Sequence, residues 1–212
     1  MMDFYQALKE GLSFPLPGAD YQLRMAPKHR KLDLPSQIRQ NAAVAIVIRN
    51  SGNDMKEVIL TKRQEYQGYH SGQVSFPGGK EESGDISLVH TAIRETYEEI
   101  GLQLHPDDFV GKLTPLFIPV SKFMVYPMVF IQLHAMEYCI DKEEVAYLIP
   151  VSIDQLLNHS LIQTTRILIH DEWIITPCFA VKNEYVWGAT AMILSEFVEV
   201  LHRVKKKNPD HF

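Results

Sequence analysis

The chain has 212 residues, 46% of them hydrophobic, so it can bury one sizeable core, and this length fits one domain better than two. The formal net charge is −5 and both signs are mixed along the chain, which argues against nucleic acid as a partner. The first residues form an amphipathic pattern and not a signal peptide, and no apolar run approaches the roughly 20 residues of a membrane span, so we expect a cytoplasmic protein without membrane contact.

The predicted elements begin with an N-terminal helix, followed over residues 11–35 by a stretch rich in Pro and Gly. We expect residues 1–35 to form this helix and an irregular arm packed on the domain, and residues 36–212 to form the domain itself. Cys139 and Cys178 fit no metal motif, and we expect both to be buried thiols. Alternating or continuous apolar runs predict strands at 42–49, 58–62, 73–76, 113–118, 124–133, 145–149, 165–169 and 173–181.

A helical period replaces the strand period over residues 86–100. Ile86, Val89, Ile93 and Ile100 recur at steps of three or four residues, which predicts one buried helix face, and Gly101 stands where a C-cap belongs. A capping-box pattern at 152–155 predicts a short helix, and the last helix is predicted to end near residue 204. Strands interleaved with a few helices predict an α/β fold with a mixed sheet covered on both faces.

The helix over 86–100 carries three glutamates on one side. At about 100° per residue, Glu95, Glu98 and Glu99 fall in a narrow sector nearly opposite the apolar positions. Like charges at this spacing repel, and a hard divalent cation with oxygen ligands, such as Mg²⁺, would remove the repulsion. An ordinary solvated helix face is the alternative, since many exposed helices are acidic.

Two neighbouring features favour the metal site over the solvated face. Gly78 and Gly79 let backbone groups approach a ligand closely just before the acidic helix. Arg94 is spaced to pair with Glu98 four residues on and to hold it in place. A glycine turn, a loop and an acid-bearing helix together predict a cradle for a metal ion and a pyrophosphate.

This segment resembles the Nudix box, whose second half reads R-E-U-x-E-E-x-G-U, with U a bulky aliphatic residue. The residues that match are Arg94, Glu95, Glu98, Glu99, Gly101 and Leu102. Thr96 occupies an aliphatic position, and Asp85 stands one residue too early where the first Glu of the box is expected. The resemblance implies the Nudix α/β/α sandwich, hydrolysis of a diphosphate bond in a small nucleotide-like substrate, and Mg²⁺ or Mn²⁺ as cofactor.

The residues before the box are similar to the signature of coenzyme A pyrophosphatases, L-T-x-R followed by H-x-G-Q-V-x-F-P-G-G. The matching positions are Leu60, Thr61, Arg63, His70, Gly72, Gln73, Val74, Phe76, Pro77, Gly78 and Gly79, and residues 186–194 resemble the closing W-G-x-T-A segment. A Leu-Arg pair often found before the His is replaced by Gln67 and Gly68. This likeness implies that coenzyme A (CoA) or acyl-CoA is cut to 4′-phosphopantetheine and 3′,5′-ADP.

The resemblance also assigns roles to individual residues. Glu95, Glu98 and Glu99 are implied metal ligands, with the Gly78 carbonyl as a fourth, and Arg94 positions the acids. The general base is Glu98 or Glu95 in the box, or Glu143 or Glu144 before a predicted strand. The candidate phosphate-binding residues are Arg63, His70, Lys80 and Lys62.

Two alternative functions remain open from the sequence. One is hydrolysis of ADP-ribose or a dinucleotide, and the other is a Nudix-fold binding module without turnover. The complete set of box acids disfavours the binding module, because a binder does not need all of them. Related proteins commonly form homodimers, although no sequence feature here requires one.

Overall fold

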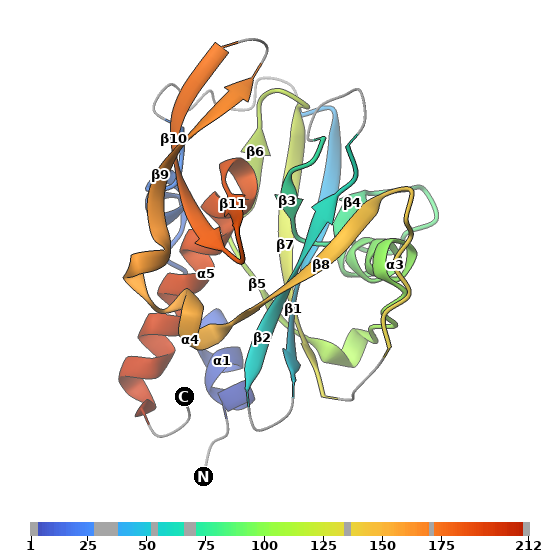
Figure 1. Cartoon of the computed structure of the whole chain (residues 1–212). Helices are drawn as coiled ribbons and strands as arrows, with labels where there is room; N and C mark the ends of the chain where they lie inside the picture. The colour runs from blue at the N-terminus through green and yellow to red at the C-terminus, as the bar shows by residue number, and fades with distance from the viewer. Residues whose placement is uncertain are drawn as a thin grey trace.

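The computed structural model describes residues 4–27, 38–51, 55–65, 71–133, 137–169 and 172–209 (Figure 1). Within these residues the helices are α1 (Phe4–Ser13), α2 (Ala19–Leu23), α3 (Leu88–Ile100), α4 (Ile153–Leu156) and α5 (Gly188–Lys207), with 3₁₀ turns η1 (Pro106–Asp108) and η2 (His159–Leu161). The strands are β1 (Gln40–Asn50), β2 (Lys56–Arg63), β3 (Val74–Ser75), β4 (Gly78–Lys80), β5 (Phe109–Lys112), β6 (Leu116–Ile118), β7 (Phe123–Gln132), β8 (Val145–Ser152), β9 (Ile162–Ile169), β10 (Glu172–Val181) and β11 (Glu184–Val186).

The main sheet is mixed, because its central strand β1 runs parallel to β7 and antiparallel to its other neighbours. The parallel pairing extends from Gln40 opposite Phe123 to Arg49 opposite Gln132. β1 also pairs with β2 near one end and with β4 near the other. β2 continues to β3 and β8, and β7 continues to β5 and β6. A strand buried on both faces needs a nearly continuous apolar run, which is what β1 provides.

Helices cover both faces of this sheet. Ala45 and Val47 share a core cluster with Ala92 of α3, whereas Ile46 and Ile48 belong to a larger cluster formed with α1 and α5. Successive side chains of a strand point to opposite faces, so these clusters lie on opposite sides of β1. The predicted α/β/α arrangement with a mixed sheet between helices is therefore confirmed.

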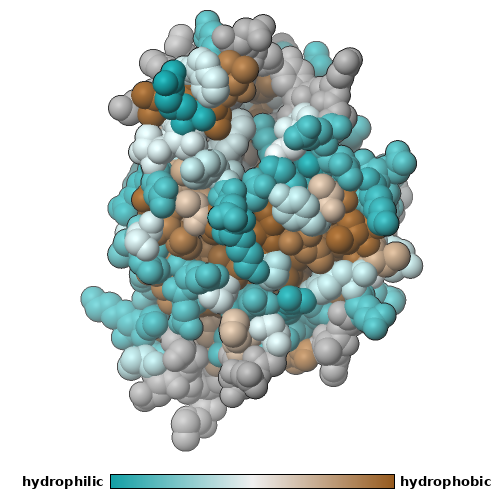
Figure 2. Space-filling view, viewed as in Figure 1, coloured by the Kyte–Doolittle hydropathy of each residue, from teal (hydrophilic) through white to brown (hydrophobic). Residues whose placement is uncertain are grey.

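A second, three-stranded antiparallel sheet of β9, β10 and β11 lies on the side of the main sheet away from α3 (Figure 1). Its long hairpin pairs Leu168 with Trp173 and Arg166 with Ile175. Leu168, Trp173 and Ile175 are all more than half exposed. Figure 2 shows hydrophobic surface at this hairpin beside strongly hydrophilic atoms.

The N-terminal helices pack on α5. Leu8 of α1 is fully buried in the larger cluster, and α2 is joined to α5 by a buried carboxylate, that of Glu196. This carboxylate accepts hydrogen bonds from Gly18 N, Gln22 Nε2 and the amide and hydroxyl of Thr114. The stretch expected to be irregular therefore contains the end of α1 and the short helix α2 within its described residues, 11–27.

Several element predictions need correction. β4 and β5 are absent from the sequence prediction, because three residues containing two glycines, and four residues containing one, carry little strand pattern. The acidic helix begins at Leu88 and not at Ile86, since Ser87 is its N-cap, and Ile86 is 80% exposed and outside the core. Cys178 is buried as expected, but Cys139 is exposed.

Other local predictions are confirmed. Gly101 caps α3 in the left-handed conformation, and Ser152 and Gln155 form the capping box of α4. In the described part of the chain, no helix combines the length and the apolar character needed to cross a membrane.

Candidate active site

The glycine pair of β4 passes tightly between β1 and α3. A Cβ atom on Gly78, whose φ is 144°, would lie 2.3 Å from the Ala43 carbonyl oxygen. A Cβ atom on Gly79 would lie 2.4 Å from a carboxylate oxygen of Glu95. Only glycine fits at position 78, and a Cβ at position 79 would displace the Glu95 carboxylate, so the backbone of β4 lies directly against the acidic side of the helix.

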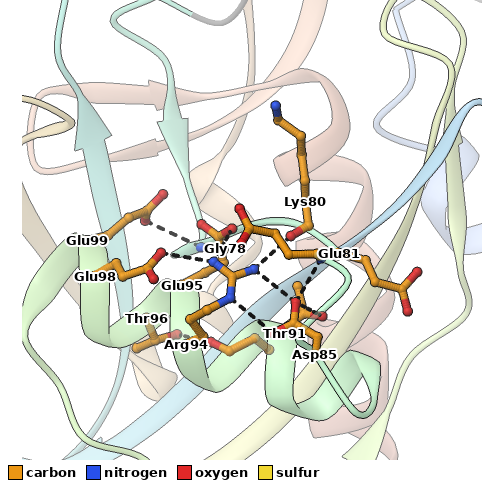
Figure 3. Close-up of polar contacts among 12 residues, drawn as sticks. Gly78, Lys80, Glu81, Asp85, Thr91, Arg94, Glu95, Thr96, Glu98 and Glu99 are labelled. Atoms are coloured by element: carbon orange, nitrogen blue, oxygen red, sulfur yellow. Dashed lines mark hydrogen bonds and ion pairs between the residues drawn. The ribbon is translucent and has the colours of Figure 1, made fainter.

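Arg94 is the centre of a hydrogen-bond network among the acids (Figure 3). Its guanidinium donates to both oxygens of Asp85 at 3.0 Å, to Glu95 at 3.0 Å and to Glu98 at 2.9 Å. It also donates to the carbonyl oxygen of Lys80 at 2.9 Å. The predicted pairing of Arg94 with Glu98 is confirmed, and the same side chain also links the helix to β4.

Asp85 holds Arg94 in position from the turn before the helix. Its carboxylate also accepts a hydrogen bond from the Thr91 hydroxyl and one from the Glu82 amide. The hydrogen bond from Arg94 is the main reason why the pKa of Asp85 lies well below its ordinary value. Although Asp85 is shorter than the Glu of the box pattern, it still contacts the box arginine.

Glu99 is buried, not solvated. Its side chain is 3% exposed, it accepts a hydrogen bond from Gly78 N at 3.3 Å, and it lies 3.6 Å from Nη1 of Arg63. Burial, with the nearby charges of Glu144 and Glu95, raises the pKa of Glu99 to about 8, although Arg63 opposes the shift. The prediction that all three glutamates lie opposite the core is therefore wrong for Glu99, because β4 and β2 cover that side of the helix.

Glu95 and Glu98 differ in their exposure to solvent. The side chain of Glu95 is 15% exposed, and burial raises its pKa despite the hydrogen bond from Arg94. The side chain of Glu98 is 55% exposed. The exposure of the glutamate side chains to solvent thus increases from Glu99 through Glu95 to Glu98.

These oxygen donors fit a hard divalent cation. Desolvation raises the pKa of both Glu99 and Glu95, and a nearby cation would favour their ionised forms. Among the described residues, no group of three or more acidic, His or Cys side chains converges as it stands, because Arg94 attracts Glu95 and Glu98 while Glu99 turns to Gly78 and Arg63. Cation binding would therefore require these carboxylates to change rotamer.

A cleft of about 1420 Å³ extends from the acids into the space between the two sheets. Its polar lining includes residues of α3 and β4 with Arg63 and Glu144, and much of the remaining lining is apolar. The apolar lining comes from β1, β6 and the segment after it, β7, the hairpin and α5 with its N-cap, and consists of Ala42, Val44, Ile118, Val120, Phe123, Val125, Ile167, Leu168, Trp173, Trp187 and Ile193. A pyrophosphate alone needs far less room, so the cleft has space for a large substrate.

Most of the predicted site residues line this cleft. They are Gly78, Lys80, Arg63, Arg94, Glu95, Glu98, Glu99 and Glu144. Lys62 does not line it, because its amine pairs with Glu184 of β11 at 2.7 Å. The predicted phosphate-binding residue His70 lies outside the described residues.

Other cleft residues were not predicted from the sequence, among them Arg166 and Trp173 of the hairpin and Phe123 of β7. Arg166 and Trp173 belong to no motif, and only the packing of the second sheet beside the first brings them to the cleft.

A sandwich fold with a glycine strand against an acidic, arginine-linked helix defines a class of pyrophosphate-cleaving enzymes. A family model described as the NUDIX domain matches residues 39–160, and the chain belongs to this family. It is 32% identical over 161 residues to "Uncharacterized Nudix hydrolase NudL" from Yersinia pestis (strain Pestoides F), over 75% of this chain and 79% of that protein. A protein of the same name from Yersinia pseudotuberculosis serotype O:3 (strain YPIII) matches equally.

Solved structures share the fold at low sequence identity. A MutT/nudix family protein from Enterococcus faecalis has a TM-score of 0.52 at 15% identity, over 87% of this chain and 73% of that one. The Nudix hydrolase RenU from M. smegmatis has a TM-score of 0.50 at 16% identity, over 78% and 87%. The protein is therefore a Nudix hydrolase, an enzyme that cleaves pyrophosphate bonds in small nucleotide-linked substrates with divalent metal ions.

Proposed function

We propose that the protein hydrolyses the pyrophosphate bond of CoA or acyl-CoA, giving 4′-phosphopantetheine, or its acylated form, and 3′,5′-ADP. The observation that carries the proposal is the large cleft, whose lining combines the acidic helix with many apolar side chains. A pantetheine arm is long and only weakly polar, so it suits that space. The residues similar to the CoA pyrophosphatase signature support the same assignment, since six of them line the cleft: Arg63, Gly72, Gln73, Phe76, Gly78 and Gly79.

In this proposal Glu95, Glu98 and Glu99 hold Mg²⁺ or Mn²⁺, together with the carbonyl oxygen of Gly78. The ion neutralises charge on the pyrophosphate oxygens when it is bound. Arg94 positions the acids, because it links Glu95 and Glu98 to Asp85 and to the backbone of β4.

Arg63 and Lys80 bind the substrate phosphates. The Nε atom of Arg63 is buried and has no hydrogen-bond partner among the described residues, so an incoming phosphate oxygen would satisfy it. The amine of Lys80 points away from Arg94 and is free to meet a phosphate (Figure 3). Lys62 instead stabilises the contact between the two sheets through Glu184.

Glu144 is the proposed general base. It lies in the cleft close enough to raise the pKa of Glu99 and Glu95, and its side chain makes no hydrogen bond or ion pair with another described residue. Glu98, by contrast, is held by Arg94. Glu144 would take a proton from water as the water oxygen bonds to phosphorus and the bridging P–O bond breaks.

A substrate panel with Mg²⁺ and with Mn²⁺ tests the proposal, with products resolved by mass. We expect CoA or an acyl-CoA to have the highest kcat/KM, with water-derived oxygen in one phosphate product. Faster turnover of ADP-ribose or a dinucleotide would replace the CoA assignment. Binding of these compounds without any turnover would instead indicate a binding module.

The E144Q and E98Q variants separate the two candidate bases. If Glu144 is the base, E144Q loses kcat by about 100-fold or more while metal affinity is retained. E98Q is then expected to act mainly by weakening metal binding. The reverse pattern would assign the base to Glu98.

A further inference from the structure

The hairpin of the second sheet carries a cation, Arg166, on an exposed face with apolar neighbours. Arg166 of β9 pairs in register with Ile175, and its neighbours on the same face are Leu168 and Trp173. The guanidinium carbon of Arg166 lies 5.3 Å from the centre of the Trp173 ring. This cation–π contact orients the guanidinium on a side chain that is itself 61% exposed.

Arg166 and Trp173 both line the cleft that contains the acids. Of the three arginines along this cleft, Arg94 is paired with three carboxylates and Arg63 with Glu99. Arg166 makes no ion pair with any other described residue. It is therefore the cleft arginine that lies beside no carboxylate in the part of the protein that the structure describes.

The position of Arg166 separates it from the pyrophosphate site. Figure 1 shows the hairpin and α3 on opposite sides of β3 and β4. Arg63 and Lys80 belong to the main sheet beside the acids, whereas Arg166 belongs to the second sheet. A substrate bound at the acids and extended along the cleft would bring a second, distant anionic group to Arg166.

The chemistry of the pair favours a phosphate monoester on a nucleoside. A planar guanidinium binds phosphate through two parallel hydrogen bonds. The exposed indole of Trp173 offers a flat surface on which a base can stack. The guanidinium of Arg166 can therefore bind the phosphate of a phosphorylated nucleoside, and the indole of Trp173 can stack on its base.

We propose that Arg166, oriented by Trp173, binds a phosphate on the ribose of the substrate and so selects nucleotides that carry this additional group. The inference rests on the proposed function, for which that group is the 3′-phosphate of CoA. The nucleoside end of the substrate then lies under the hairpin, and the pantetheine arm occupies the rest of the apolar cleft.

The kinetic test compares CoA with 3′-dephospho-CoA, which lacks only the phosphate in question. R166Q is expected to lower kcat/KM for CoA by about 10- to 100-fold, mainly through KM, and to leave kcat/KM for dephospho-CoA unchanged. R24Q is the matched control, because Arg24 also lies over an aromatic ring, that of Tyr21 at 3.7 Å, but does not line the cleft. Equal losses on both substrates, or a wild-type enzyme indifferent to the 3′-phosphate, would overturn the proposal.

A calorimetric test measures the same site without turnover. The wild type should bind 3′,5′-ADP more tightly than 5′-AMP. Both R166Q and W173A should remove this difference in affinity. R166Q should still bind 5′-AMP. If the panel shows no cleavage of CoA but this difference is present, the proposed function fails and the phosphate site stands. Equal affinity of the wild type for the two nucleotides would refute the site, whatever substrate the enzyme cleaves.

Discussion

Glu99 is nearly excluded from solvent and faces Glu95 and Glu144, while Arg63 offsets only part of the cost of its charge. Its pKa of about 8 means that the folded, metal-free protein keeps this carboxyl protonated near neutral pH. Metal binding must therefore displace a proton from Glu99, and the affinity of the site for Mg²⁺ should rise as pH increases toward 8.

This proton linkage predicts a pH-dependent stabilisation by metal. Without metal, the unfolded chain ionises Glu99 near its ordinary value of 4.5, so the free energy of unfolding falls as pH rises from there toward 8. Added Mg²⁺ should reverse the loss, and the rise in Tm that it causes should be larger at about pH 8.5 than at about pH 5.5. Differential scanning calorimetry of wild type and E99Q measures this. A metal-induced rise that is the same at both pH values, or unchanged in E99Q, would contradict it.

At the scale of elements, β4 completes the site, because it places backbone groups against the acidic side of α3. This strand of three residues pairs with β1. The Gly78 amide donates a hydrogen bond to Glu99, and the Lys80 carbonyl accepts one from Arg94. Gly79→Ala would place a methyl group 2.4 Å from the Glu95 carboxylate. The flexible carboxylate can swing away, so we expect a protein that folds but whose kcat falls by about 100-fold.

Gly84→Ala is the control for this prediction, because a Cβ atom there meets nothing within 4 Å. Circular dichroism should show both variants folded, and only the Gly79 variant should lose activity. Full activity of the Gly79 variant would mean that the position of Glu95 is not critical.

The same strand explains what could be predicted from the sequence and what could not. The spacing of Arg94, Glu95 and Glu98 is local, and the helix geometry fixes it. The burial of Glu99 depends on β4 and on Arg63 of β2, which lie elsewhere in the chain, so periodicity alone placed it opposite the core with the other two glutamates. The hairpin residues Arg166 and Trp173 were missed for the same reason, since only tertiary packing brings them to the cleft.

For the whole molecule, Glu196 joins three distant segments. Its carboxylate on α5 accepts hydrogen bonds from Gly18 at 3.1 Å, Gln22 at 2.8 Å and the Thr114 hydroxyl at 2.7 Å. E196Q replaces one of these acceptor oxygens with a donor, which leaves at least one buried donor unsatisfied at a cost of about 1–3 kcal/mol.

Urea denaturation measures this loss in the free energy of unfolding. E199Q, three residues along the same helix, removes an ion pair with the partly exposed Arg203 and should cost about 0–1 kcal/mol. Equal stability of the Glu196 variant and the wild type would show that water replaces the missing contacts.

The docking of α1 and α2 on α5 also has a consequence for biosynthesis. α1 and α2 lie far ahead of α5 in the chain, so the part of their packing surface formed by Val200, Leu201 and Val204 exists only after α5 has been translated. Until then Leu8 and Leu12 lack the apolar side chains of α5, and the nascent chain exposes hydrophobic surface there. A chain truncated within α5 is therefore expected to need a chaperone, because α1 and α2 would keep part of this hydrophobic surface exposed.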